Sequence, residues 1–191
     1  GERTQGFQIW VKVPGSNKLD RPEYGTVPPD SLPALAVSSD VNARILAGTM
    51  FDQMDLFHTK QPIQMADFEL ASSDSQLEFD IDKDLDTAIL FIYEGDGLSE
   101  VNDHKEHIPA QSVVLLDASD LEKRGVSLRF SGKTNLMLFA GKKLKEPIAW
   151  RGPIVMNTQE EIAETIRDIR SSRFPPIRVD WDYKRAVDSS R

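Results

Sequence analysis

The stretch Ala88-Ile-Leu-Phe-Ile-Tyr-Glu-Gly-Asp-Gly97 decides the fold. Its six leading apolar residues predict a buried strand, and the two glycines that follow allow the positive φ angles of a tight turn. We therefore expect the strands on either side of this turn to pair antiparallel. The apolar run is far shorter than the roughly 18 residues that a membrane-spanning helix needs, so no membrane partner is expected.

Working outward from this stretch, similar short runs recur on both sides. At the start of the chain, Phe7, Ile9, Val11 and Val13 alternate with more polar residues, which predicts a half-buried strand over residues 6–14. A proline-rich segment, residues 16–40, then favours an ordered surface connection. The further predicted strands are residues 43–47, 63–70, 76–81, 112–117, 126–131 and 135–141. Their spacing is typical of an all-β antiparallel sandwich.

One segment has helical periodicity. Ile162, Ile166 and Ile169 recur at helical spacing, and Thr158 with Glu161 forms a capping-box pattern. We predict a C-terminal helix over about residues 158–172. The sequence thus suggests one domain over residues 1–174 and a basic tail over residues 175–191.

Composition limits the function classes. With 39% apolar and 28% charged residues among 191, the chain can bury a core and keep a polar surface. The formal net charge of -8 argues against direct nucleic-acid binding, which depends on Lys and Arg. The absence of cysteine excludes disulfides and thiolate chemistry in this sequence. We expect a cytoplasmic or nuclear protein.

Four carboxylates alternate in Asp80, Asp82, Asp84 and Asp86, which raises the question of a calcium site. An EF-hand loop does not fit, because a loop that starts at Asp80 has Leu85 where glycine must make the turn. The surrounding residues 66–103 hold twelve acidic residues and one lysine. We favour a solvated strand edge or turn that keeps the sheet soluble and could also face a basic partner.

Other candidate groups do not form a recognisable active site. His104 and His107 lie in a polar segment that we expect to be a surface loop, and His58 is distant in sequence. We therefore assign no catalytic, cofactor-binding or metal-binding residue. We expect the basic clusters to lie on solvated surfaces. We expect the tryptophans to be core residues or interface anchors. These residues are Lys142, Lys143, Lys145, Arg167, Arg170, Arg173, Trp10, Trp150 and Trp181.

An ordered set of motifs resembles the pirin family over most of the chain, to about Phe174. The motifs are Gly6-Phe-Gln-Ile-Trp-Val-Lys-Val-Pro14, Arg21-Pro-Glu-Tyr24, Arg44-Ile-Leu-Ala-Gly48, Ala140-Gly-Lys-Lys-Leu-Lys-Glu-Pro147 and Gly152-Pro-Ile-Val-Met-Asn-Thr158. The last one, directly before an acidic helix start, is the most specific. The chain looks like the second of the two domains of a pirin, which implies a jelly-roll-like cupin fold.

The resemblance also carries functional implications. Pirins are bicupins in which the first domain holds iron through three His and one Glu, while the second is normally metal-free. Whole pirins are linked to quercetin 2,3-dioxygenase activity and to nuclear co-regulation of Rel-type transcription factors. This sequence lacks the family's His-Pro-His motif, so we expect iron only in an absent N-terminal half.

Two functions follow. The first is a non-catalytic cupin domain that packs against a second cupin domain, another protein or a second copy of itself. The alternative is a metal-dependent dioxygenase with ligands from the aspartate run, Asp80 to Asp86, together with His104 and His107.

Overall fold

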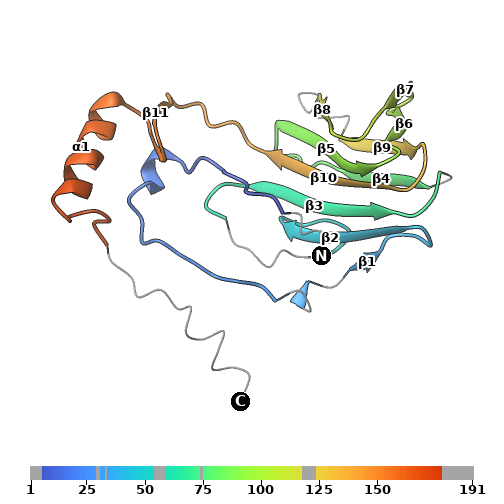
Figure 1. Cartoon of the computed structure of the whole chain (residues 1–191), viewed down its shortest axis with the longest axis horizontal. Coiled ribbons are helices and arrows are strands. Elements are labelled where there is room, and N and C mark those ends of the chain that lie inside the picture. The colour runs from blue at the N-terminus through green and yellow to red at the C-terminus, as the bar shows by residue number, and fades with distance from the viewer. Residues whose placement is uncertain are drawn as a thin grey trace, which may run out of the picture. The chain divides into compact units, whose positions relative to one another are not determined.

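The computed structural model describes residues 6–28, 31–32, 34–53, 59–73, 75–117 and 124–177 (Figure 1). The chain forms two compact units. The sheet unit comprises residues 26–143, and the terminal unit comprises residues 1–25 with 144–191. The predictions for His58 and Trp181 lie outside the described residues. No helix in the described ranges is long and apolar enough to cross a membrane.

The sheet unit is a β-sandwich of antiparallel strands, as expected. One sheet has six strands in the order β1-β2-β3-β10-β5-β8, and the other has four in the order β4-β9-β6-β7. The first sheet contains Leu35–Ala36 (β1), Val41–Ala47 (β2), Ile63–Leu70 (β3), Thr134–Gly141 (β10), Thr87–Gly95 (β5) and Ser112–Leu116 (β8). The second contains Gln76–Asp80 (β4), Gly125–Phe130 (β9), Leu98–Val101 (β6) and His104–Ile108 (β7).

Alternation along the strands builds the core. Phe68, Leu90 and Leu138 of the six-stranded sheet and Leu77 and Leu128 of the four-stranded sheet are fully buried in one hydrophobic cluster. Complete burial of such a side chain contributes about 1.5–3 kcal/mol relative to leaving it in water. The predicted strands over residues 43–47, 63–70, 76–81, 88–93, 112–117, 126–131 and 135–141 are all confirmed within two residues at their ends.

The turn after Tyr93 does not form the predicted hairpin. Strand β5 pairs with β10 and β8, whereas β6 pairs with β7 and β9 of the other sheet. Gly95 and Gly97 do have positive φ angles, 101° and 87°. Thr134 on the neighbouring strand β10, the register partner of Gly95, holds the turn, since its Oγ1 lies 3.1 Å from both the nitrogen and the oxygen of Gly97. The positive φ angles of Gly95 and Gly97 thus allow the turn in which the chain crosses from one sheet to the other.

Two local predictions are wrong. Residues 6–14 form no strand, and the side chains of Phe7, Ile9 and Val11 are between 41% and 47% exposed. A period of two describes only local side-chain orientation, and a strand also needs a partner edge. Conversely, His104 to Ile108 forms β7 at a sheet edge instead of a loop. Its polar residues fit that position, because edge strands are often charged.

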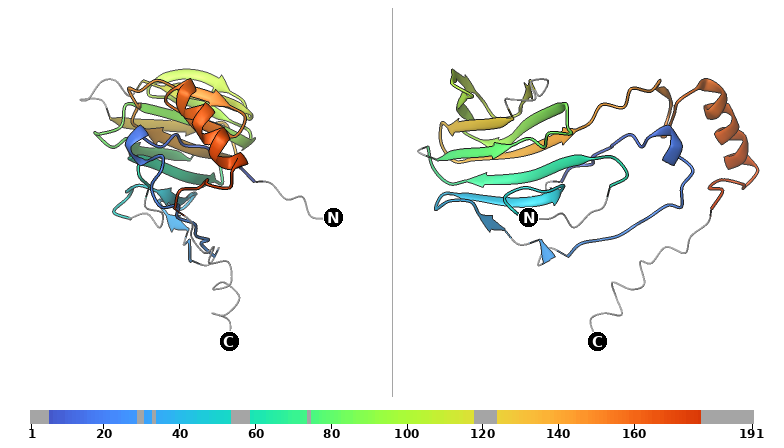
Figure 2. Two further views of the ribbon diagram at one scale, coloured as in Figure 1. Left: turned by 90° about the vertical axis from the view of Figure 1, so that its left-hand side faces the viewer. Right: turned by 180° about the vertical axis from the view of Figure 1, so that it is seen from behind.

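The terminal unit joins the two ends of the chain. It contains a 3₁₀ turn, Gly15–Asn17 (η1), the hairpin Ala149–Arg151 (β11) and Ile154–Met156 (β12), and the helix Gln159–Arg170 (α1). The predicted capping box is confirmed: Thr158 Oγ1 accepts from Glu161 N at 3.1 Å, and Glu161 Oε2 accepts from Thr158 N at 3.0 Å. Helix α1 contacts both strands of the hairpin (Figure 2).

Candidate functional site

The outward face of the six-stranded sheet is apolar across four neighbouring strands. One row of register partners crosses β3, β10, β5 and β8 in that order, and its residues are Met65, Phe139, Ile89 and Leu115. A second row contains Met137, Phe91 and Val113. We call these seven residues the outer apolar patch.

None of the seven patch residues belongs to the buried core cluster. Val113 and Leu115 on the edge strand β8 are 64% and 73% exposed. Met137 is buried, but it does not belong to the core cluster, because the neighbouring residues of its strand face inward. An antiparallel sheet with one solvated face normally alternates apolar and polar residues, whereas apolar residues on both faces are typical of a sheet covered on both sides. The patch therefore has the character of an interface.

A charged cluster borders the outer apolar patch. Arg44 Nη1 lies 3.4 Å from Asp67 Oδ2 and also contacts Glu69 Oε1. The hydroxyl of Tyr93 donates to Asp67 Oδ1 at 2.9 Å. Burial raises the pKa of Asp67, and burial together with the neighbouring Asp67 carboxylate raises the pKa of Tyr93. Tyr93 therefore stays a hydrogen-bond donor at neutral pH and positions Asp67.

The same border holds an enclosed acceptor. Asn135 lies between Glu69 and Glu94 in the sheet register, and its Nδ2 donates to Glu94 Oε2 at 3.3 Å. Its Oδ1 is buried and has no hydrogen-bond partner in the part of the chain that the structure describes. Leaving a buried acceptor unpaired costs roughly 1–3 kcal/mol. Asn135 Oδ1 is already enclosed, so it is not an acceptor that a docking surface would reach.

The aspartate run makes loop contacts. Asp82 Oδ1 accepts from Asp84 N at 2.8 Å, and Asp86 Oδ1 accepts from Lys143 N at 2.7 Å. The Lys143 N–H is the main reason that the pKa of Asp86 is lowered. Asp80 ends the edge strand β4, and Asp82, Asp84 and Asp86 lie in the turn segment that follows, which agrees with the prediction of a solvated strand edge or turn. These carboxylates fix a turn by binding backbone N–H groups.

Gln64 is a buried polar residue that sequence reasoning missed. Its Nε2 donates to the carbonyls of Thr49 at 3.0 Å and Asp80 at 3.3 Å, and its Oε1 accepts from Asp82 N at 2.9 Å. It thereby ties β3 to two other segments. The available signal was a polar residue at an inward position of an alternating strand.

The described residues do not fit an iron ion. His104 and His107 are exposed on β7, and His107 Nδ1 lies 3.1 Å from Ser131 Oγ. Among the residues the structure describes, no group of three or more His, Asp or Glu side chains is arranged to hold a metal. Histidine and carboxylate ligands must converge on one point to bind a transition metal. Iron chemistry has no ligand set in this part of the chain.

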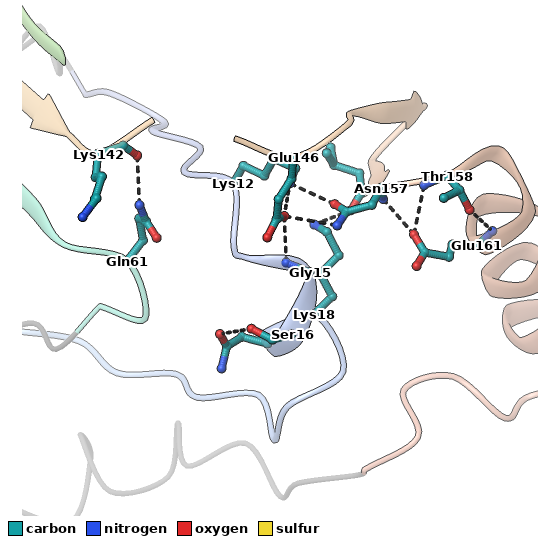
Figure 3. Close-up of polar contacts among 12 residues, drawn as sticks. Lys12, Gly15, Ser16, Lys18, Gln61, Lys142, Glu146, Asn157, Thr158 and Glu161 are labelled. Atoms are coloured by element: carbon teal, nitrogen blue, oxygen red, sulfur yellow. Dashed lines mark hydrogen bonds and ion pairs between the residues drawn. The ribbon is translucent and has the colours of Figure 1, made fainter. Parts of the chain in front are cut away.

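Glu146 clamps the terminal unit together (Figure 3). Its Oε2 accepts from Lys12 Nζ at 3.0 Å, Gly15 N at 3.0 Å and Asn157 Nδ2 at 3.1 Å. Lys12 Nζ also donates to Asn157 Oδ1 at 2.9 Å. These donors, above all Lys12, lower the pKa of Glu146. In the sheet unit, the carbonyl of Lys142 accepts from Gln61 Nε2 at 2.9 Å (Figure 3).

The remaining predicted residues lie at the surface. Trp10 and Trp150 are 62% and 72% exposed, so neither is a core residue. The side chains of Lys145, Arg170 and Arg173 are exposed, as predicted for a solvated loop and a helix end.

The chain is similar to a known family model, to curated proteins and to a solved structure. The family model described as "Pirin C-terminal cupin domain" matches residues 65–175, from β3 to just beyond α1. Pirin from Homo sapiens is 26% identical over 172 residues, which cover 90% of this chain. A pirin-like protein from Caulobacter vibrioides is 28% identical over 174 residues. A crystal structure of quercetin 2,3-dioxygenase from Acinetobacter baumannii superposes with a TM-score of 0.77 at 26% identity over 86% of the chain.

The chain spans well under two thirds of these relatives. It covers 58% of human pirin, 59% of the Caulobacter protein and 55% of the Acinetobacter enzyme. Each relative thus contains a large part that has no counterpart in this sequence.

Proposed function

The chain belongs to the pirin family through its C-terminal cupin domain, and we propose that it is a non-catalytic cupin domain that packs against a second cupin domain. The outer apolar patch carries this proposal, above all the exposed Val113 and Leu115 on β8. These two side chains are the exposed part of the patch, beside the half-buried Ile89 and Phe91 of β5. Exposed apolar surface that continues a larger apolar face is typical of interaction sites. The second domain would cover the patch, including the side chains of Val113 and Leu115.

The length comparison supports the same partner. The relatives extend beyond the matched region by enough residues for another domain, since this chain accounts for 58% of human pirin. Under this proposal, oxygenase activity and iron would belong to the companion. The described ligand geometry gives no support to the alternative, a dioxygenase that uses Asp80 to Asp86 with His104 and His107.

Self-association tests the packing role, because two copies can cover each other's patch when the companion is absent. Sedimentation equilibrium is expected to show reversible dimers of the chain. The variant Val113→Thr/Leu115→Thr should weaken them about a hundredfold, since each of the four substituted side chains in a dimer loses roughly one buried methyl or methylene group, at about 0.8 kcal/mol each.

Ile148→Thr is the matched control, because Ile148 is 68% exposed but lies in the terminal unit. An equal effect of this control would move the interface away from the sheet. A strictly monomeric chain at high concentration would contradict the packing proposal. Conversion of quercetin by the chain with added Fe(II), at a rate comparable to that of a whole pirin, would contradict its non-catalytic character.

A further inference from the structure

A groove of about 680 Å³ crosses the terminal unit and is separate from the outer apolar patch. Large apolar side chains on its walls are between 40% and 72% exposed. They are Trp10, Leu19, Ile148, Trp150, Ile169 and Phe174. This volume falls within the roughly 300–1,000 Å³ of ordinary ligand sites, which are lined mainly by apolar and aromatic side chains with a few polar groups.

Lys12 and Lys18 are the charged residues that line the groove, and Asn17 and Thr165 are its other polar residues. The charge of Lys12 is matched by Glu146, whose Oε2 lies 3.0 Å from Lys12 Nζ. Lys18 Nζ donates to the carbonyl of Val155 at 2.9 Å, and no ion pair of Lys18 occurs among the described residues. An ammonium group has three donors, so two N–H bonds of Lys18 remain for another acceptor.

The surroundings of Lys18 favour an anion. Burial and the neighbouring Lys12 charge lower the pKa of Lys18 by more than the carboxylates of Glu146 and Glu161 raise it, so the positive charge of Lys18 is on balance disfavoured. A bound anion would offset both effects. A neutral apolar molecule would cover the walls but would give the two remaining N–H groups of Lys18 no acceptor.

We propose that this groove binds an amphipathic anion, with its apolar part along the tryptophan-lined walls and its carboxylate or sulfonate at Lys18. The apolar contacts supply affinity, and the ammonium group selects the charge of the head group. This site does not depend on the proposed packing of the sheet unit, because all of its lining residues belong to the terminal unit.

Titration of octanoate into the full 191-residue chain tests the site. The indole N–H resonances of Trp10 and Trp150 are to be followed by ¹H–¹⁵N correlation spectra, since both rings line the groove. Octanoate should shift both resonances saturably. Octanol, which has the same tail without the charge, should bind at least fivefold more weakly.

Variants separate the charge from the fold. Lys18→Met keeps the apolar stem and should weaken octanoate binding at least fivefold, whereas Lys18→Arg should retain it. Lys105→Met, on the exposed edge strand β7, is the matched control and should change nothing. A dispersed spectrum of each variant establishes that it is folded.

Three results would overturn the proposal: no shift of either tryptophan, equal affinity of Lys18→Met and the unaltered chain, or equal affinity for octanol and octanoate. The last result would assign the groove to a neutral apolar surface of a partner protein.

Discussion

Replacing Gln64 with leucine should destabilise the sheet unit, because Gln64 is 4% exposed and holds three segments together. The substitution removes the partner of two backbone carbonyls and of the Asp82 N–H. A buried group left unpaired costs roughly 1–3 kcal/mol. Asp82 is exposed and can bind water instead, and leucine regains some apolar burial. The expected loss in the free energy of unfolding is therefore about 2–3 kcal/mol.

The assay is urea unfolding followed by circular dichroism, with thermal melting as a second measure. For a chain of 191 residues, each 1 kcal/mol lowers the melting temperature by roughly 2–4 °C. Gln76→Leu is the matched control, since Gln76 is exposed on β4. If Gln64→Leu and Gln76→Leu changed the unfolding free energy equally, the structural role of Gln64 would be refuted.

Three further predictions concern the turn, the charged cluster and metal. Thr134→Val should cost about 1–3 kcal/mol in urea unfolding, because the buried N–H of Gly97 loses its acceptor. The pKa of Tyr93 is raised in the folded chain, so above about pH 10 the unfolded chain loses the Tyr93 phenol proton first. The free energy of unfolding should therefore fall as the pH rises above about 10. Tyr93→Phe should make this dependence on pH weaker, as measured by urea unfolding. Adding Fe(II) should leave the melting temperature unchanged, and elemental analysis should find no stoichiometric transition metal; a raised melting temperature would revive the Asp/His alternative.

The amino-acid sequence by itself determined the local elements and the family. Short apolar runs at the spacing of a sandwich predicted the long strands, including residues 63–70, because such runs mark segments that can be buried in a sheet. Thr158 and Glu161 predicted the start of α1, because a capping box involves only neighbouring residues. The resemblance to pirins likewise rests on ordered motifs that are readable without coordinates, and the family match confirms it.

Tertiary structure alone decided which strands pair. Gly95 and Gly97 carried the signal of a hairpin, but Thr134, far along the chain, anchors them in a turn that crosses between sheets. Residues 6–14 had the alternation of a strand, but no sheet edge pairs with them among the described residues.

The candidate sites followed the same division. Val113 and Leu115 are ordinary strand residues in sequence, and their place in an apolar outer face depends on register with β5 and β10. Likewise, Lys12 and Glu146 form an ion pair only because residues 1–25 and 144–191 fold into one unit. Local patterns are set by backbone geometry within a few residues, whereas pairing, register and the surfaces they create are set by contacts between residues that are distant in the sequence.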